Sequence, residues 1–155
     1  MQHAVVLDAK LLTLFIVGAT SAEYISRHKR LRPYTRTDFE LLISLLRPAS
    51  GVLLTPNTLS EVSNWLGYID DPARTLIFGR FRELIQSTEE RYIESKRAVA
   101  RNEFNRLGLA DAALLDLAAD SHTLLTDDFD LYRAALDQDF PVINFTHIRA
   151  SHLET

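Results

Sequence analysis

The segment HAVVLDAKLL, residues 3–12, joins the pattern of a strand directly to the pattern of a helix. Its first half, from His3 to Leu7, is a short apolar run with β-branched residues, which is typical of a buried strand. Asp8 follows this run, and a helix is predicted from about Lys10 to Val17. A short apolar strand that leads into a helix favours a βαβ arrangement and a mostly parallel sheet.

The same alternation recurs along the rest of the chain, which predicts an α/β fold. Two helices are expected to begin at capping boxes, Thr37-Asp-Phe-Glu40 and Thr58-Leu-Ser-Glu61. The other predicted helices cover about residues 22–28, 73–86, 96–106, 110–119 and 129–136. Further short strands are predicted at Val52–Leu54, Arg91–Ile93, His122–Thr126 and Val142–Asn144.

Length and composition narrow the class of protein. The 155 residues are 46% hydrophobic and 25% charged, as in an ordinary globular protein, and predict a single domain over residues 1–155. The absence of cysteine excludes disulfides, thiolate metal sites and cysteine nucleophiles. No apolar stretch is long enough to span a bilayer, and no basic segment precedes the first strand as it would in a signal peptide. We therefore expect a cytoplasmic protein with no membrane segment.

Charge is unevenly distributed along the chain, although the net charge is only −4. From Asp111 to Asp139 there are eight acids, opposed only by Arg133. Residues 24–36 instead contain no acid, and we call their five basic residues the basic strip. These are Arg27, Lys29, Arg30, Arg32 and Arg36. Such a strip is most simply a solvated helix end and loop, but beside an acidic cluster it is also compatible with nucleic-acid binding.

Several acids fall where a parallel sheet places its ligand site, beyond the carboxyl ends of the strands. Asp8 directly follows the first strand, and Glu61 lies early in the helix after the second. Asp111 is in phase with the apolar residues of its helix and should lie on the inward face. Three more acids, Asp127, Asp128 and Asp130, follow the strand that ends at Thr126.

Acids that converge on one sheet edge repel one another unless a cation lies among them, and a buried carboxylate is normally paired, protonated or bound to metal. Oxygen ligands without cysteine or a histidine pair favour Mg²⁺ or Mn²⁺, which can activate water at a phosphate. Each acid also has a structural interpretation. Glu61 could complete the capping box of Thr58, Asp111 could interact with a helix dipole, and Asp127 or Asp128 could cap the next helix.

Four segments of the chain, VVLDAKLL, TPNTLSEVSNWL, RLGLADAALLDLA and LLTDDFDLY, resemble the acidic blocks of PIN domains. The resemblance extends from Val5 to about Phe145. It implies a three-layer α/β/α sandwich on a mostly parallel sheet of about five strands, and cleavage of RNA with Mg²⁺ or Mn²⁺ held by three or four acids. Many compact bacterial members are VapC-like toxins, so the resemblance also implies a homodimer and an inhibiting antitoxin protein as partners.

Carried over to this sequence, the resemblance implies that Asp8, Glu61 and Asp111 are the first three catalytic metal ligands. The fourth is Asp128, with Asp130 as the alternative, and Thr126 supports the site by hydrogen bonding. One position departs from the family pattern. Lys10 stands two residues after the first aspartate, where the family usually has a small polar residue, often Asn.

The sequence therefore predicts a metal-dependent endoribonuclease that grips the RNA backbone with the basic strip and stacks an unpaired base on Tyr34 or, if it is exposed, Trp65. Two other functions remain open. In the first, Lys10 takes the place of the metal, and the domain binds RNA or a protein without cleaving. In the second, Asp128 or Asp8 accepts a phosphoryl group with the help of Lys10.

Overall fold

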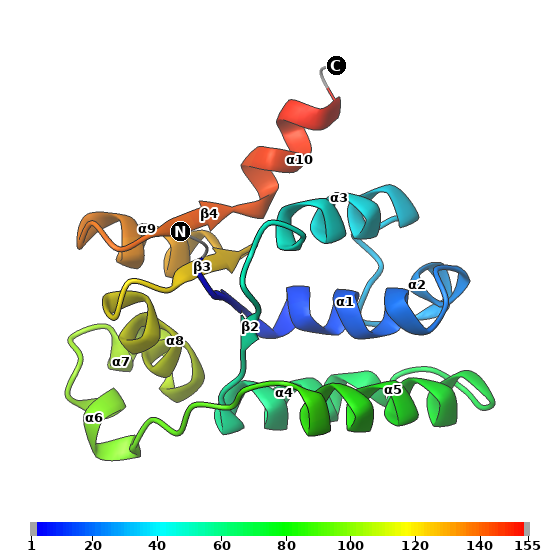
Figure 1. Cartoon of the computed structure of the whole chain (residues 1–155), viewed down its shortest axis with the longest axis horizontal. Coiled ribbons are helices and arrows are strands. Elements are labelled where there is room, and N and C mark those ends of the chain that lie inside the picture. Colours follow the sequence, from blue (N-terminus) through cyan, green and yellow to red (C-terminus); the bar gives the residue numbers. More distant parts are fainter. Residues whose placement is uncertain (1–2, 154–155) are drawn as a thin grey trace.

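The computed structural model describes residues 3–153, which form an α/β fold with helices around a small parallel sheet (Figure 1). Within these residues the strands are β1 (Val5–Leu7), β2 (Val52–Leu53), β3 (Thr123–Thr126) and β4 (Val142–Asn144). The helices are α1 (Ala9–Thr20), α2 (Glu23–Arg27), α3 (Arg36–Leu46), α4 (Pro56–Leu66), α5 (Ala73–Ser87), α6 (Ser95–Val99), α7 (Phe104–Leu107), α8 (Leu109–Ala119), α9 (Phe129–Asp137) and α10 (Phe145–Leu153).

The sheet has the order β2-β1-β3-β4, and each neighbouring pair is parallel. The predicted parallel α/β class is therefore confirmed, but the described residues form four strands and not about five. The strand predicted at Arg91–Ile93 is wrong. Its neighbour Glu90 makes only an isolated bridge to Leu54, and the chain then leaves the sheet edge toward α6. A single bridge pairs only one residue with the sheet, which is too little to form a strand.

Two apolar cores lie on opposite faces of the sheet. Alternate side chains of a strand point to opposite faces, and in β1 Val5 and Leu7 join one core while Val6 joins the other. The first core includes residues of α1, α4 and α5, and the second includes residues of α8 and α9. Figure 1 shows these two groups of helices on the two sides of the sheet. Helices therefore cover both faces, as in a three-layer α/β sandwich.

The helix starts differ in detail from the predicted ones. The capping box of α3 is formed by Thr35 and Asp38, and not by Thr37 and Glu40. Helix α4 is capped by Thr55, whose hydroxyl accepts a hydrogen bond from the backbone N–H of Thr58, so the box predicted at Thr58 is also wrong. In α3, a second Thr–acid pair with the same spacing, Thr35 and Asp38, starts the helix earlier. In α4, the earlier start is favoured by Pro56 at the first helical position.

Two longer predictions also change. The helix predicted over about residues 96–106 is divided into α6 and α7 by a turn, and α10 follows β4 without having been predicted.

No helix within residues 3–153 is both long and apolar enough to cross a membrane.

Candidate functional site

Asp8 connects the end of β1 to the start of α1. Its side chain is 5% exposed, and its Oδ1 accepts a hydrogen bond from the backbone N–H of Leu11 at 2.9 Å, which caps the helix. Its Oδ2 accepts hydrogen bonds from the Thr126 hydroxyl at 2.5 Å and from the Asp127 backbone N–H at 2.8 Å. Burial raises the pKa of Asp8, and these three hydrogen bonds act in the opposite direction. The carboxylate is thus fixed in position at the carboxyl end of the sheet.

Thr126 links two of the predicted site residues. Its fully buried hydroxyl donates to Asp8 and accepts a hydrogen bond from the backbone N–H of Asp128 at 3.0 Å. Asp128 in turn caps α9, because its Oδ1 accepts from the backbone N–H of Leu131 at 3.0 Å. The capping interpretation of Asp128 is therefore correct, and its second oxygen makes no hydrogen bond with the described residues. Capping and ligand binding are compatible for a carboxylate with two oxygens.

Asp111 lies in the first turn of α8, after Gly108, whose φ of +89° favours glycine. Burial raises the pKa of Asp111 to about 7, with further contributions from the negative charges of Asp128, Asp8 and Glu61. Three carboxylates from other elements therefore act on this group through space. Asp111 is therefore the residue whose pKa is raised by the negative charges of all three other predicted acids.

Glu61 lies in the middle of α4, so it does not complete a capping box, and that interpretation is wrong. Burial raises the pKa of Glu61, and the charge of Asp8 raises it further. The structure thus brings the first four predicted acids into one electrostatic field. Asp130 is exposed in the first turn of α9 and is not among the charges that shift the pKa of Asp8, Glu61 or Asp111.

Lys10 is exposed in the first turn of α1 and makes no ion pair with the described residues. It is also not among the charges that shift the pKa of Asp8, Glu61 or Asp111. Its ammonium is therefore paired with none of these acids in the structure.

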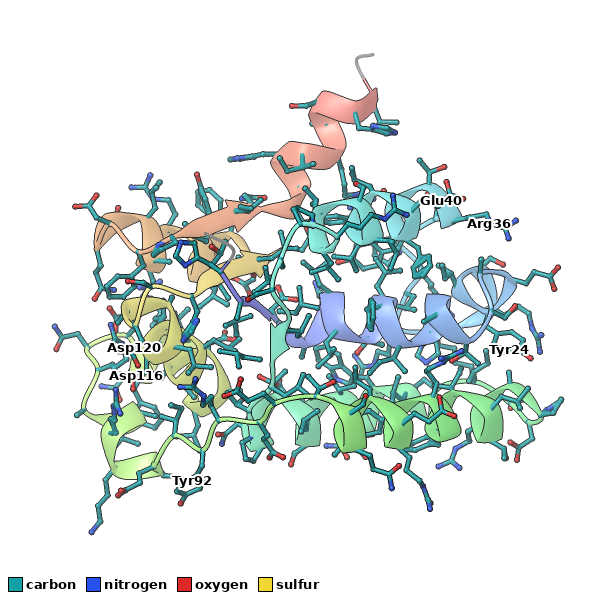
Figure 2. All side chains as sticks on the ribbon, viewed as in Figure 1. Tyr24, Arg36, Glu40, Tyr92, Asp116 and Asp120 are labelled. Atoms are coloured by element: carbon teal, nitrogen blue, oxygen red, sulfur yellow. The ribbon has the colours of Figure 1, made fainter. Side chains whose placement is uncertain are left out.

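The acidic residues further along α8 show a different arrangement. Asp116 pairs with Arg97 at 2.5 Å and with Arg101 at 3.1 Å, and Asp120 lies 3.9 Å from Arg97 (Figure 2). These carboxylates have protein cations as partners. Asp8, Glu61, Asp111 and Asp128 have none within residues 3–153.

The donor chemistry of these four acids fits a hard divalent cation. In the part of the chain that the structure describes, no three acidic or histidine side chains are already grouped as metal ligands. The four carboxylates are coupled by charge, and mutually repelling carboxylates come together when a divalent cation neutralises them. A ligand set of oxygens alone, with no protein cation among them, is the type that Mg²⁺ or Mn²⁺ prefers.

The basic strip follows α1 in the sequence, and all five of its residues are exposed. The Arg30 guanidinium lies 4.6 Å from the ring centroid of Tyr68, which is 44% exposed, and 5.8 Å from that of Trp65. Arg36 pairs with Glu40 at 4.0 Å on the surface of α3 (Figure 2). The strip therefore combines exposed cations with aromatic rings. The segment that carries the strip also reaches the acids, because the hydroxyl of Tyr34 donates to Asp127 Oδ2 at 2.6 Å.

The proposed base-stacking role of Tyr34 does not agree with its burial. The side chain is 4% exposed, and its hydroxyl donates to Asp127 Oδ2 at 2.6 Å. Burial and this hydrogen bond raise the pKa of Tyr34 above its ordinary value. Trp65 is partly buried against the first core, so only a part of its ring is accessible.

Sequence reasoning missed the partners of Asp127. Its carboxylate accepts hydrogen bonds from Tyr34 and from the Thr146 hydroxyl, and lies 3.8 Å from Arg149 Nη1. Tyr34 precedes α3, whereas Thr146 and Arg149 both belong to α10, so the partners come from two segments that are distant from each other in the sequence. The adjacent acids Asp127 and Asp128 are visible in the sequence, but no pattern there indicates which of them faces α10.

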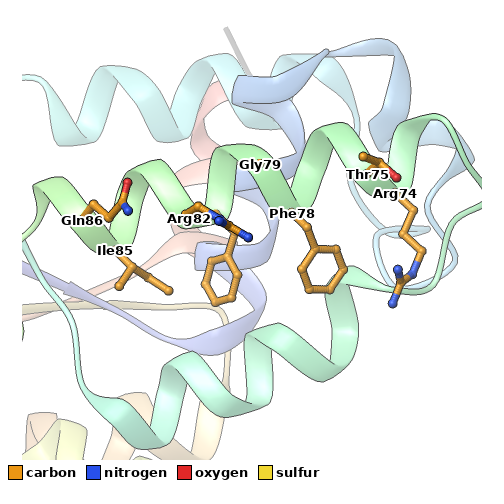
Figure 3. Close-up of a pocket in the computed structure, with 8 residues that line it drawn as sticks. Arg74, Thr75, Phe78, Gly79, Arg82, Ile85 and Gln86 are labelled. Atoms are coloured by element: carbon orange, nitrogen blue, oxygen red, sulfur yellow. The ribbon is translucent and has the colours of Figure 1, made fainter.

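A groove of about 740 Å³ lies along α5 (Figure 3). It is lined by side chains of this one helix, among them Arg74, Phe78, Arg82 and Ile85. None of the predicted acids lines it.

No family model matches the chain, and no curated protein matches it.

Proposed function

We propose that this protein is a PIN-like endoribonuclease that uses Mg²⁺ or Mn²⁺ to hydrolyse RNA phosphodiester bonds. The observation that carries the proposal is the coupling at Asp111, whose pKa is raised to about 7 by burial and by the charges of Asp128, Asp8 and Glu61. A cluster of carboxylates at the carboxyl end of a parallel sheet, with no protein cation, is the environment that a catalytic divalent ion requires. The order of the acidic segments along the chain supports the same class.

Within this proposal, Asp8, Glu61, Asp111 and Asp128 would hold the metal. The bound ion would supply activation of water and stabilisation of negative charge on the phosphate. Asp8 is fixed by Leu11, Thr126 and Asp127, so its position is set before any ligand binds. Such preorganisation reduces the cost of assembling the site. Asp130, on the exposed side of α9, is the weaker candidate for the fourth ligand.

The basic strip would bind the RNA backbone, since all five of its residues are exposed and none of them pairs with an acid of the cluster. Its exposed cations would contact phosphates, and Tyr68 beside Arg30 offers a ring face to an unpaired base. This replaces Tyr34, which is buried, as the stacking residue. The antitoxin and the homodimer remain predictions of the resemblance.

Cleavage of a mixed pool of single-stranded RNA with Mn²⁺ tests the proposal. We expect the wild type to cleave and Asp8→Asn to lose activity, because the substitution removes a carboxylate of the cluster. Asp137→Asn is the matched control, since Asp137 is an exposed acid on α9 that pairs only with Arg133 at the surface. Equal behaviour of wild type and Asp8→Asn would rule out the nuclease and leave a non-cleaving binding module. Acid-labile phosphate on aspartate after treatment with acetyl phosphate would instead identify a phosphoacceptor.

A further inference from the structure

Asp127 makes hydrogen bonds through both its backbone and its side chain, and of these only the backbone bond reaches the acidic cluster. Its backbone N–H donates to Asp8 Oδ2 at 2.8 Å. Its side chain is directed to other partners: Oδ2 accepts from the Tyr34 hydroxyl at 2.6 Å, and Oδ1 accepts from the Thr146 hydroxyl. Arg149 Nη1 lies 3.8 Å from Oδ2. Asp127 therefore connects the carboxylate of Asp8 to groups outside the acidic cluster.

Two of these groups belong to α10, which is itself held against the body of the protein. Arg149 donates from Nε to Asp38 Oδ1 at 2.9 Å and from Nη2 to Asp38 Oδ2 at 3.1 Å, a bidentate pair. Its Nη2 also donates to the Pro33 carbonyl at 2.9 Å, and its guanidinium lies 5.1 Å from the Tyr34 ring centroid. Phe145, at the start of α10, is fully buried. Helix α10 thus follows β4 directly (Figure 1) and is attached to α3 by the Arg149–Asp38 pair.

Asp127 and Asp128 are adjacent in the sequence, but their carboxylates have different surroundings. Asp128 contributes its charge to the field at Asp111, whereas the Asp127 carboxylate is bound by a phenol, a hydroxyl and a guanidinium. With its carboxylate held in this way, the backbone of Asp127 is oriented so that its N–H meets Asp8. Hydrogen-bonding partners that orient a ligand are a recurrent feature of metal sites.

We propose that Asp127 is a positioning residue through which α10 fixes the carboxylate of Asp8, an inference that rests on the proposed metal-dependent function. The chain of contacts runs from Thr146 and Arg149 through the side chain of Asp127 to its backbone, and from there to Asp8. Weakening the contacts on α10 therefore loosens an acid that lies 138 positions earlier in the sequence than Thr146. No residue of α10 needs to touch the metal or the RNA.

The test compares three variants of α10 in the full chain. Thr146→Val removes the hydroxyl that binds Asp127 and keeps the shape of the side chain, and Thr146→Ser restores the hydroxyl. Ser151→Ala removes a hydroxyl from the exposed end of the same helix and serves as the control. A further variant outside α10, Tyr34→Phe, removes only the phenolic hydroxyl, which is another hydrogen-bond donor to the Asp127 carboxylate.

Three quantities are measured: the exchange rate of the Asp127 backbone amide without metal, the affinity for Mn²⁺, and the free energy of unfolding. We expect Thr146→Val to speed the exchange of this amide and to weaken Mn²⁺ binding by about tenfold, the lower end of the effect of losing a group that orients a metal ligand. Thr146→Ser should restore both quantities. Ser151→Ala should leave them unchanged, and amides of the central strands should keep their protection in all variants.

Two outcomes separate this inference from the proposed function. If the wild type binds Mn²⁺ and cleaves RNA while both Thr146→Val and Tyr34→Phe leave the Asp127 amide and the Mn²⁺ affinity unchanged, the positioning role is overturned and the nuclease stands. If the wild type neither binds Mn²⁺ nor cleaves, the nuclease fails, and the exchange rate in the metal-free protein still decides whether α10 holds Asp127. A uniform loss of protection across the sheet would indicate a general stabilising role of α10 and would overturn the positioning role.

Discussion

The hydroxyl of Thr126 donates to Asp8 Oδ2 at 2.5 Å and joins the ends of two neighbouring parallel strands, although 118 positions separate the residues in sequence. The hydroxyl oxygen of Thr126 also accepts a hydrogen bond from the backbone N–H of Asp128 at 3.0 Å. Thr126 is fully buried, so each of these bonds forms away from solvent. One hydroxyl thus sets the relative positions of the first and the fourth predicted acids.

Replacing Thr126 with Val is expected to destabilise the protein by about 1–3 kcal/mol, because it leaves a buried Asp8 oxygen with one donor fewer and the Asp128 N–H without an acceptor. Urea denaturation measures this change. Thr126→Ser keeps the hydroxyl and should recover most of the stability. If Val and Ser variants unfold at the same urea concentration as the wild type, the hydroxyl does not have this structural role.

The metal-free protein should lose stability as the pH rises from about 4 to about 7. Burial and three acidic neighbours raise the pKa of Asp111 from 3.8 to about 7, so in this range the folded state binds more protons than the unfolded state. The stabilising contribution of the neutral carboxyl is present below pH 3.8 and is lost as the pH passes the folded-state pKa. The raised pKa values of Asp8 and Glu61 act in the same direction.

Asp111→Asn isolates this effect. At about pH 8 in a chelator, the variant should be more stable than the wild type by about 2 kcal/mol, since each pKa unit corresponds to about 1.4 kcal/mol and solvent screens a partly exposed group. The difference between the two proteins should shrink as the pH is lowered to about 4. Added Mn²⁺ should stabilise the wild type more than the variant, because it binds the folded state. A difference that does not change with pH would contradict the assignment.

The fold class and the position of the acids follow from short-range patterns in the sequence. Apolar runs alternate with amphipathic stretches, which indicates parallel strands, and a parallel sheet places the residues after Leu7 and Thr126 at the same edge. The placement of Asp8 and Asp128 near one another could therefore be predicted. Asp111 could be predicted because it stands in the first turn of a helix that follows the pattern of the fold, whereas Glu61, expected in a first turn, lies in the middle of α4.

The remaining features depend on contacts between distant segments. Thr35–Asp38 and Thr37–Glu40 have the same capping-box spacing, and the structure selects the first, in which Asp38 also binds Arg149. Nothing near Tyr34 in the sequence shows that its hydroxyl is buried against Asp127, 93 positions away. Local patterns predict elements, but they do not identify partners that meet only after the helices pack.

Gly18 in α1 should not tolerate a larger residue. A Cβ atom at this position would lie 2.2 Å from the ring of Phe39 in α3, closer than any normal contact. We expect Gly18→Ala to destabilise the protein by about 1–3 kcal/mol, because overpacking outweighs the gain in helix propensity. Gly79→Ala in α5 is the matched control, since a Cβ atom there meets nothing within 4 Å, and it should stabilise the protein by about 0.5–1 kcal/mol. Thermal unfolding of the two variants would refute the packing argument if their midpoints shifted in the same direction.

Arg30→Ala should weaken the binding of single-stranded RNA and make it less dependent on salt. Each phosphate contact releases counterions and contributes about 0.7 to the slope of log affinity against log salt for single strands. Arg30 also supports the exposed ring of Tyr68, so Tyr68→Ala should lower the affinity without changing this slope. Arg47→Ala is the control, because Arg47 is an exposed cation at the C-terminal cap of α3 and lies outside the basic strip. Binding is measured in a chelator to prevent cleavage. Equal salt slopes for wild type, Arg30→Ala and Arg47→Ala would show that the basic strip is a solvated surface and that RNA reaches the acids by another route.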